Sequence, residues 1–224
     1  MNSTIKSGGL VALMSFFMTL SSFAQTNRFS ISLNSLTTNF NYGKSNEELQ
    51  SYKKNFRGLQ AGFAYQAGIS PLFSVAPEIY FAIKGGTLKE SNPLTIGKST
   101  LQVYSLELPI LARLHCKNLF LNAGPYAGYN LGGRLKIKDV ETGQTTNTKI
   151  NFGKAKSDLK NWDYGFQAGA GYNFNMKKSI LTLDLRYGYG MANISNNVKR
   201  FNRMLNISVK VSALAEKSSK KAEG

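Results

Sequence analysis

Histidine and cysteine, the residue types that most often carry nucleophilic or metal chemistry, each occur once, as the neighbours His115 and Cys116. A nucleophile needs an adjacent base that is oriented by a third group, and a metal site normally needs three or four ligands. One imidazole beside one thiol meets neither requirement, and no phosphate loop, zinc helix or nucleophile elbow is present. We therefore predict no catalytic residues, no metal site and no cofactor, with Cys116 a turn residue.

A second set of candidate residues consists of charged side chains within strand faces that are otherwise small and polar. Buried charges persist only when they are paired and hydrogen-bonded, so the sequence predicts an interior network of ion pairs. Its members would be Glu78, Glu107, Arg113, Asp163, Asp184, Arg186 and Lys210. The alternative is that some charged side chains lie near the ends of the strands and are solvated by water. This alternative fits Lys84 and Asp163 equally well.

A third set accounts for the basic character of the chain, which has a formal net charge of +16 at pH 7. Facing outward, these residues would meet the phosphate groups of lipopolysaccharide through charge-assisted hydrogen bonds. A generic solvated cationic loop explains them equally well. The candidates for such lipopolysaccharide-facing basic loops are Arg134, Lys136, Lys138, Lys154, Lys156, Lys160, Lys199, Arg200 and Arg203.

The elements that position these residues are strands. Apolar residues alternate with small or polar residues along much of the chain, and a helical period of apolar residues is hard to find. In WDYGFQAGAGYNF at 162–174, one face is aromatic and apolar, while glycines on the other leave room for larger neighbours such as Arg113 and Arg186. Pro77 interrupts another segment and is a candidate bulge position. The eight predicted strands are 28–36, 58–69, 73–84, 101–114, 118–131, 162–174, 180–190 and 203–214.

The links between these strands alternate between long and short. Long polar links cover 37–57, 85–100, 132–161 and 191–202, and short links lie around 70–72, 115–117 and 175–178. Outer-membrane barrels have long outside loops, short periplasmic turns and an even number of strands. The polar faces are poor in charge, and aromatic residues lie near the strand ends, which disfavours a soluble barrel. We therefore predict an all-β fold, an eight-stranded antiparallel up-and-down transmembrane β-barrel with its lumen filled by side chains.

The two ends of the chain carry separate signals. Residues 1–24 combine Lys6, the apolar run GGLVALMSFFMTL and small residues before Gln25, as a cleaved signal peptide does. This predicts a barrel domain over 25–214 and a disordered, charged periplasmic tail over 215–224. Export argues against nucleic acid as the partner of the positive charge.

Four motifs together suggest a family, namely LELP at 106–109, GPYAGYNLGG at 124–133, DYGFQAGAGYNF at 163–174 and LDLRYGYG at 183–190. In this order and spacing, the chain resembles the PorT-like outer-membrane β-barrel family of Bacteroidetes over roughly Ser30 to Leu214. The resemblance implies an eight-stranded barrel in the outer membrane of a Gram-negative bacterium, usually without assigned activity. PorT itself takes part in type IX secretion. The chain departs from common barrels in lacking a terminal aromatic residue after its last strand.

The leading functional hypothesis is a non-enzymatic, monomeric outer-membrane protein with a structural role in the envelope or a role in docking a protein partner. Its surroundings would be outer-membrane lipid and lipopolysaccharide, and it would bind no nucleic acid. Two alternatives remain open: an accessory component of type IX protein secretion, and a lipid A-modifying enzyme. Both alternatives place the protein in the same membrane.

Overall fold

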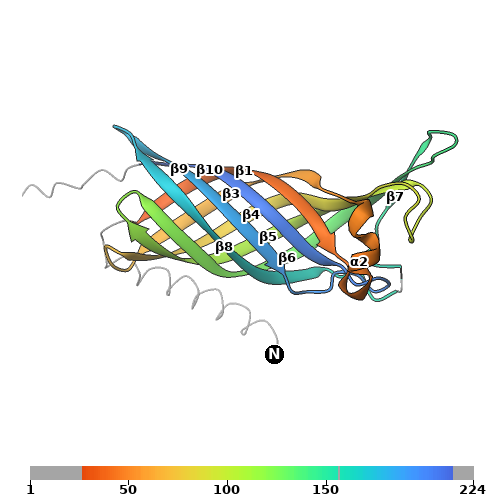
Figure 1. Ribbon diagram of the computed structural model, residues 1–224. Helices are drawn as coiled ribbons and strands as arrows, with labels where there is room; N and C mark the ends of the chain where they lie inside the picture. Colours follow the sequence, from red (N-terminus) through yellow and green to blue (C-terminus); the bar gives the residue numbers. More distant parts are fainter. Residues whose placement is uncertain (1–26, 156, 214–224) are drawn as a thin grey trace, which may run out of the picture.

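Eight long strands form a closed antiparallel barrel in the computed structural model, which describes residues 27–155 and 157–213 (Figure 1). Each strand pairs with its neighbours along the chain, and the first pairs with the last to close the ring. The predicted eight-stranded barrel is therefore confirmed. The strands are β1 (Arg28–Asn41), β3 (Phe56–Gly68), β4 (Phe73–Leu88), β5 (Lys98–Cys116), β6 (Leu119–Lys138), β8 (Trp162–Asn175), β9 (Ser179–Gly190) and β10 (Phe201–Ala213).

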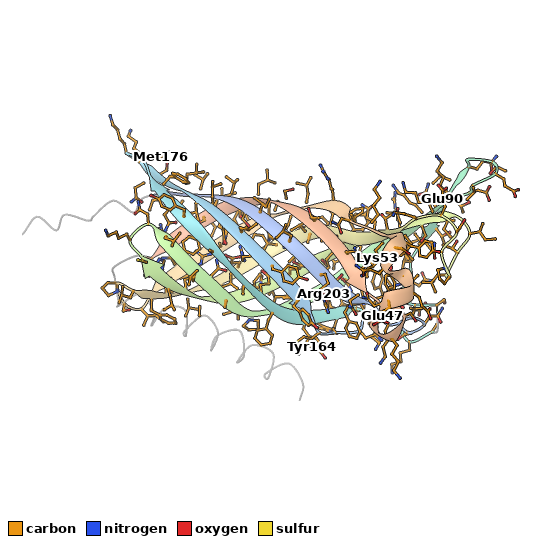
Figure 2. All side chains as sticks on the ribbon, in the orientation of Figure 1. Glu47, Lys53, Glu90, Tyr164, Met176 and Arg203 are labelled. Carbon is orange, nitrogen blue, oxygen red and sulfur yellow. The ribbon has the colours of Figure 1, made fainter. Side chains whose placement is uncertain are left out.

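Alternate side chains of each strand point to the outside of the barrel and into the lumen. On β1, Ile31 is 63% exposed on the outside, whereas Asn34 is fully buried inside. Closure of the sheet pairs the backbone groups all round the barrel, as the predicted transmembrane barrel requires. Figure 2 shows side chains projecting outward along the length of the barrel.

The four long links lie at one end of the barrel, here called the loop end, and the three short links lie at the opposite turn end. Figure 2 marks the turn end with Met176 and the loop end with Glu47 and Glu90. The link after β1 contains η2 (Gly43–Ser45), α2 (Asn46–Leu49), η3 (Gln50–Tyr52) and β2 (Lys53–Lys54), and the link after β6 contains β7 (Thr145–Lys149). Among the described residues, no helix is both long and apolar enough to span a bilayer.

A β-bulge lies on β6, not at Pro77 as the sequence suggested. Pairing on both sides of Pro77 keeps one register. The shift occurs where β5 meets β6: Tyr104 pairs with Gly132 and Ser105 pairs with Asn130, which leaves Leu131 without a partner on β5. An extra residue of this kind reverses which side chains face outward on the strand beyond it.

This reversal explains the main error in the predicted boundaries. Up to Tyr129, odd-numbered residues of β6 face outward, but beyond Leu131 the exposed positions are Arg134, Lys136 and Lys138. The alternation therefore continues in the opposite phase. The region 132–161, predicted to be one polar link, instead contains the last residues of strand β6 and the strand β7 that pairs with it.

Some predictions lie outside the described residues. They are the signal peptide over 1–24, the charged tail over 215–224, Lys156 in the third long link and Leu214 at the end of the eighth predicted strand.

Candidate functional site: the charged lumen and the basic rim

Five charged side chains meet in the half of the lumen nearer the turn end, and we call them the turn-side cluster. Glu78 is at its centre: one carboxylate oxygen accepts from Arg113 at 2.8 Å and from Lys210, and the other accepts from Arg186 at 2.7 Å. Asp184 completes it, 3.1 Å from Arg186 and 3.3 Å from Lys210. Three cations therefore share two carboxylates, and all five side chains are buried.

Three further charges form a loop-side cluster on the side of the lumen nearer the loop end. Lys84 Nζ lies 2.6 Å from Glu107 and 2.7 Å from Asp163, and both carboxylates are fully buried. Here one cation forms ion pairs with two carboxylates. The charge imbalance is thus opposite in sign to that of the turn-side cluster. Lys84, left open between rim and interior by the sequence, lies inside.

Strand geometry brings these residues together from distant parts of the chain. β4 supplies both Glu78 and Lys84, six positions apart, so that both face the lumen but at different levels. Amide side chains fill the space between the clusters, because Gln60 donates to Glu107 at 2.7 Å and accepts from Asn34 and Asn206. Each candidate for the interior network therefore has at least one oppositely charged partner.

Glycines make room for the largest inward side chains. A Cβ added at Gly169 would come within 2.7 Å of Arg186 Cγ, and one added at Gly171 would come within 2.2 Å of the Phe120 ring. The space beside Gly171 is thus taken by the Phe120 ring. The Arg113 guanidinium lies over this ring, with its Cζ atom 4.9 Å from the ring centre. Substitution at Gly171 would displace the ring that supports Arg113.

An apolar cluster, here called the loop-end core, fills the barrel beyond the loop-side cluster. Phe40 lies so close to Gly86 that an added Cβ would meet its ring at 2.5 Å. Burial raises the pKa of the Tyr42 hydroxyl, and the nearby Arg200 guanidinium partly opposes this. The members of the core are Phe40, Tyr42, Leu49, Leu88, Leu101, Val103, Leu159, Ala192 and Ile194.

The basic residues predicted to form loops occupy three different environments. Arg134, Lys136 and Lys138 form an exposed row on β6, and Lys149 faces the same side from β7. Lys154 and Lys160 border a surface hollow of about 480 Å³, together with the outward aromatic residues Tyr129, Trp162 and Tyr164. The remaining residues lie near β10.

Two of those remaining residues are held by aromatic rings. The Arg203 guanidinium stacks 3.6 Å from the centre of the Tyr189 ring and donates to backbone oxygens, and Arg200 lies 6.0 Å from the centre of the Tyr42 ring. Of these three residues, Lys199 is exposed, whereas Arg200 and Arg203 are partly buried. The rim is therefore several separate sites and not one cationic surface.

The sequence of this closed, apolar-walled barrel matches a known protein family. The family described as "Outer membrane protein beta-barrel domain" matches residues 23–196. The chain belongs to this family. No curated protein matches the sequence of this chain.

Several solved structures are similar to this outer-membrane barrel. Ail of Yersinia pestis, in complex with the heparin analogue sucrose octasulfate, is 14% identical over 84% of this chain and 99% of its own, with a TM-score of 0.42. Neisserial surface protein A is 11% identical with the same coverage and a TM-score of 0.43. The N-terminal barrel domain of Pseudomonas aeruginosa OprF is 9% identical, again with the same coverage, and its TM-score is 0.29.

His115 lies at the turn end of the outer-membrane barrel, where its Nε2 is 2.7 Å from the Ser74 hydroxyl. Ser74 is fully buried and Cys116 is exposed. No carboxylate is hydrogen-bonded to His115 among the described residues, so the pair lacks the third group that would orient a base. Within residues 27–155 and 157–213, no three His, Cys, Asp or Glu side chains converge as metal ligands would.

Proposed function

We propose that this outer-membrane barrel is closed and non-enzymatic, and that it serves as a structural element of the envelope or docks a protein partner through its loop end. The observation that carries the proposal is the succession of side chains along the lumen: turn-side cluster, amides, loop-side cluster and loop-end core. Buried ion pairs and close-packed apolar groups leave little room for a continuous water path.

The wider proposal concerns how the protein sits in the envelope. The signal peptide over 1–24 would be removed on export, the barrel over 25–214 would be a monomer in the outer membrane, and the tail over 215–224 would lie in the periplasm. Long loops outside and short turns inside follow the general rule for such barrels. The four sequence motifs support a finer assignment to the PorT-like family of Bacteroidetes.

Conductance measurements test whether the barrel is closed. Purified protein inserted into planar bilayers should give no sustained open-channel current. Folding is checked beforehand by the difference in gel mobility between unheated and heated samples. A steady ohmic current from folded wild-type protein would contradict the proposal.

Cys116, exposed at the turn end, tests the orientation. A membrane-impermeant maleimide should label it only after the outer membrane has been permeabilised. In a Cys116→Ser background, Thr142→Cys in the turn before β7 should be labelled on intact cells. The opposite labelling pattern would show that the loop end faces the periplasm.

The resemblance to PorT supports a second candidate, an accessory role in type IX secretion. Normal export of surface proteins by a deletion strain would exclude that role. A lipid A-modifying activity has weaker support, because the Ser74–His115 pair is at the turn end and its hydroxyl is buried. Unchanged lipid A in a strain carrying His115→Ala would be consistent with the absence of such activity.

A further inference from the structure

A groove of about 590 Å³ lies on the outward side of β5, β6 and β7, away from the lumen. The residues that shape it include Tyr104, Gly132, Arg134, Lys136, Asn147 and Lys149. Figure 1 shows β7 extending from the barrel at the loop end. Tyr104 belongs to the outward aromatic residues that mark a membrane interface. A ligand in this groove would therefore lie at the level of the lipid headgroups.

Like charges face each other across the strands that build the groove. Arg134 pairs directly with Lys149 between β6 and β7, and Lys98 pairs directly with Lys138 between β5 and β6. Opposed like charges destabilise a sheet. Among ion pairs between described residues, none includes these four cations or Lys136. A bound anion would remove this repulsion.

The chemistry of the groove favours a phosphate group. A guanidinium binds phosphate oxygens in a bidentate manner, and ammonium groups add charge-assisted hydrogen bonds. Asn147 supplies a further donor from β7. Gly132 leaves the floor open, since a Cβ there would have only one neighbour within 4 Å, Tyr104 Cδ2 at 3.7 Å.

The surface beside the groove favours a lipid over a soluble anion. From Tyr104 toward the turn end, the outward face of β5 continues with Leu106, Leu108 and Ile110, all of which are exposed. Acyl chains attached to a headgroup in the groove would lie along these residues.

We propose that this groove binds a phosphate group of lipopolysaccharide in the outer leaflet, with Arg134 and Lys149 as the main contacts. The inference rests on the proposed orientation, in which the loop end faces outward. Maleimide labelling of Cys116 tests that orientation separately, so failure of the orientation and failure of the groove can be told apart.

The test is titration of the refolded full-length mature protein, in zwitterionic detergent, with fluorescent lipopolysaccharide. Arg134→Gln combined with Lys149→Gln should weaken binding about tenfold or more, because two charge-assisted contacts are lost. Gly132→Val should weaken binding to a similar extent by filling the floor while every cation is kept. Unheated gel mobility verifies that both variants are folded.

The matched control is Lys44→Gln combined with Arg57→Gln. Both cations are exposed at the loop end, in the link after β1 and on β3, away from β5, β6 and β7, and the change in net charge is the same. This variant should bind within about twofold of wild type. Lipopolysaccharide stripped of its phosphate groups should bind wild type about tenfold more weakly and should not distinguish the groove variants.

Three results would overturn the proposal. The first is equal loss of binding in the groove and control variants, which would indicate general electrostatic attraction. The second is unchanged binding after removal of the phosphate groups. The third is displacement of lipopolysaccharide by an equal concentration of inorganic phosphate, which would show that the groove holds a free anion and not a lipid.

Discussion

The turn-side and loop-end regions of the lumen are filled in opposite ways. At membrane depth the inward side chains are polar and charged and the outward ones apolar, as with Asn34 and Ile31 on β1. At the loop end the inward side chains are apolar, as with Phe40, and the outward ones on β6 are cationic. The medium around the barrel decides this difference, because lipid requires an apolar wall and water does not.

The two regions also differ in how they tolerate damage. The turn-side cluster combines three cations with two carboxylates, so loss of one carboxylate leaves buried charge without compensation. The loop-end core carries no such requirement, and loss of one member leaves a cavity. Substitutions in the two regions should therefore respond differently to a second, compensating change.

The largest effect is expected from deletion of Leu131, which would remove the bulge that separates the two regions on β6. Arg134, Lys136 and Lys138 would then turn toward the loop-end core, where each buried charge would cost several kcal/mol. We expect β7 and the end of β6 to detach instead. Trypsin should cleave between Arg134 and Lys149 while the barrel keeps its unheated gel mobility.

The control for this deletion is Leu131→Ala, which keeps the extra residue and hence the phase of the strand. It should resist trypsin as wild type does. If the deletion variant were equally resistant, the bulge would not be what directs these cations outward.

A smaller but global effect is expected from Glu78→Gln in the turn-side cluster. The change leaves Arg113, Arg186 and Lys210 with only Asp184, and it should lower the free energy of unfolding by about 3–5 kcal/mol. Adding Lys210→Met should restore part of this loss, because it reduces the excess positive charge. Urea titration in lipid vesicles measures both variants.

Phe40→Ala provides the comparison from the loop-end core. Its cavity should also cost about 3–5 kcal/mol. Lys210→Met should give no recovery in this background, since the two sites share no charge. Equal recovery in both backgrounds would mean that Lys210→Met stabilises the barrel in some general way.

Sequence patterns predicted the barrel far better than they predicted its loop end. Alternation of small polar and apolar residues revealed each lipid-crossing segment, since lipid imposes that pattern along the whole strand. The bulge at Leu131 was not predicted, because a change of phase in LGGRLKIK looks like the end of a strand. The alternation of Arg134, Leu135, Lys136 and Ile137 was the signal that could have revealed the extension of β6.

The loop-end core was missed for a different reason. Leu49, Leu159 and Ile194 come from three separate links that look polar overall, and they meet only when the barrel brings the links together. Lys84 was left undecided because its partners, Glu107 and Asp163, come from β5 and β8. Ion pairs across a barrel depend on how strands that are distant in the sequence are arranged in space. Local sequence patterns do not reveal this arrangement.

The smallest expected effect is the pH response of the loop-end core at Tyr42. Burial raises the pKa of Tyr42 in the folded state above its ordinary value of 10.0. Folding thus favours the neutral hydroxyl. Its contribution to the free energy of unfolding is complete below pH 10.0 and is lost as the pH rises through the folded-state pKa. Urea unfolding of wild type and Tyr42→Phe above pH 10 should show a steeper loss of stability for wild type.

The difference between these two proteins isolates Tyr42 from the other tyrosines, which titrate in both. Arg200 near the Tyr42 ring would favour the tyrosinate and reduces the effect, but burial is the larger influence. Parallel curves for the two proteins would mean that the loop end opens to water at high pH before Tyr42 titrates. The core would then be a surface layer that separates from the barrel, and the charged clusters alone would close the lumen.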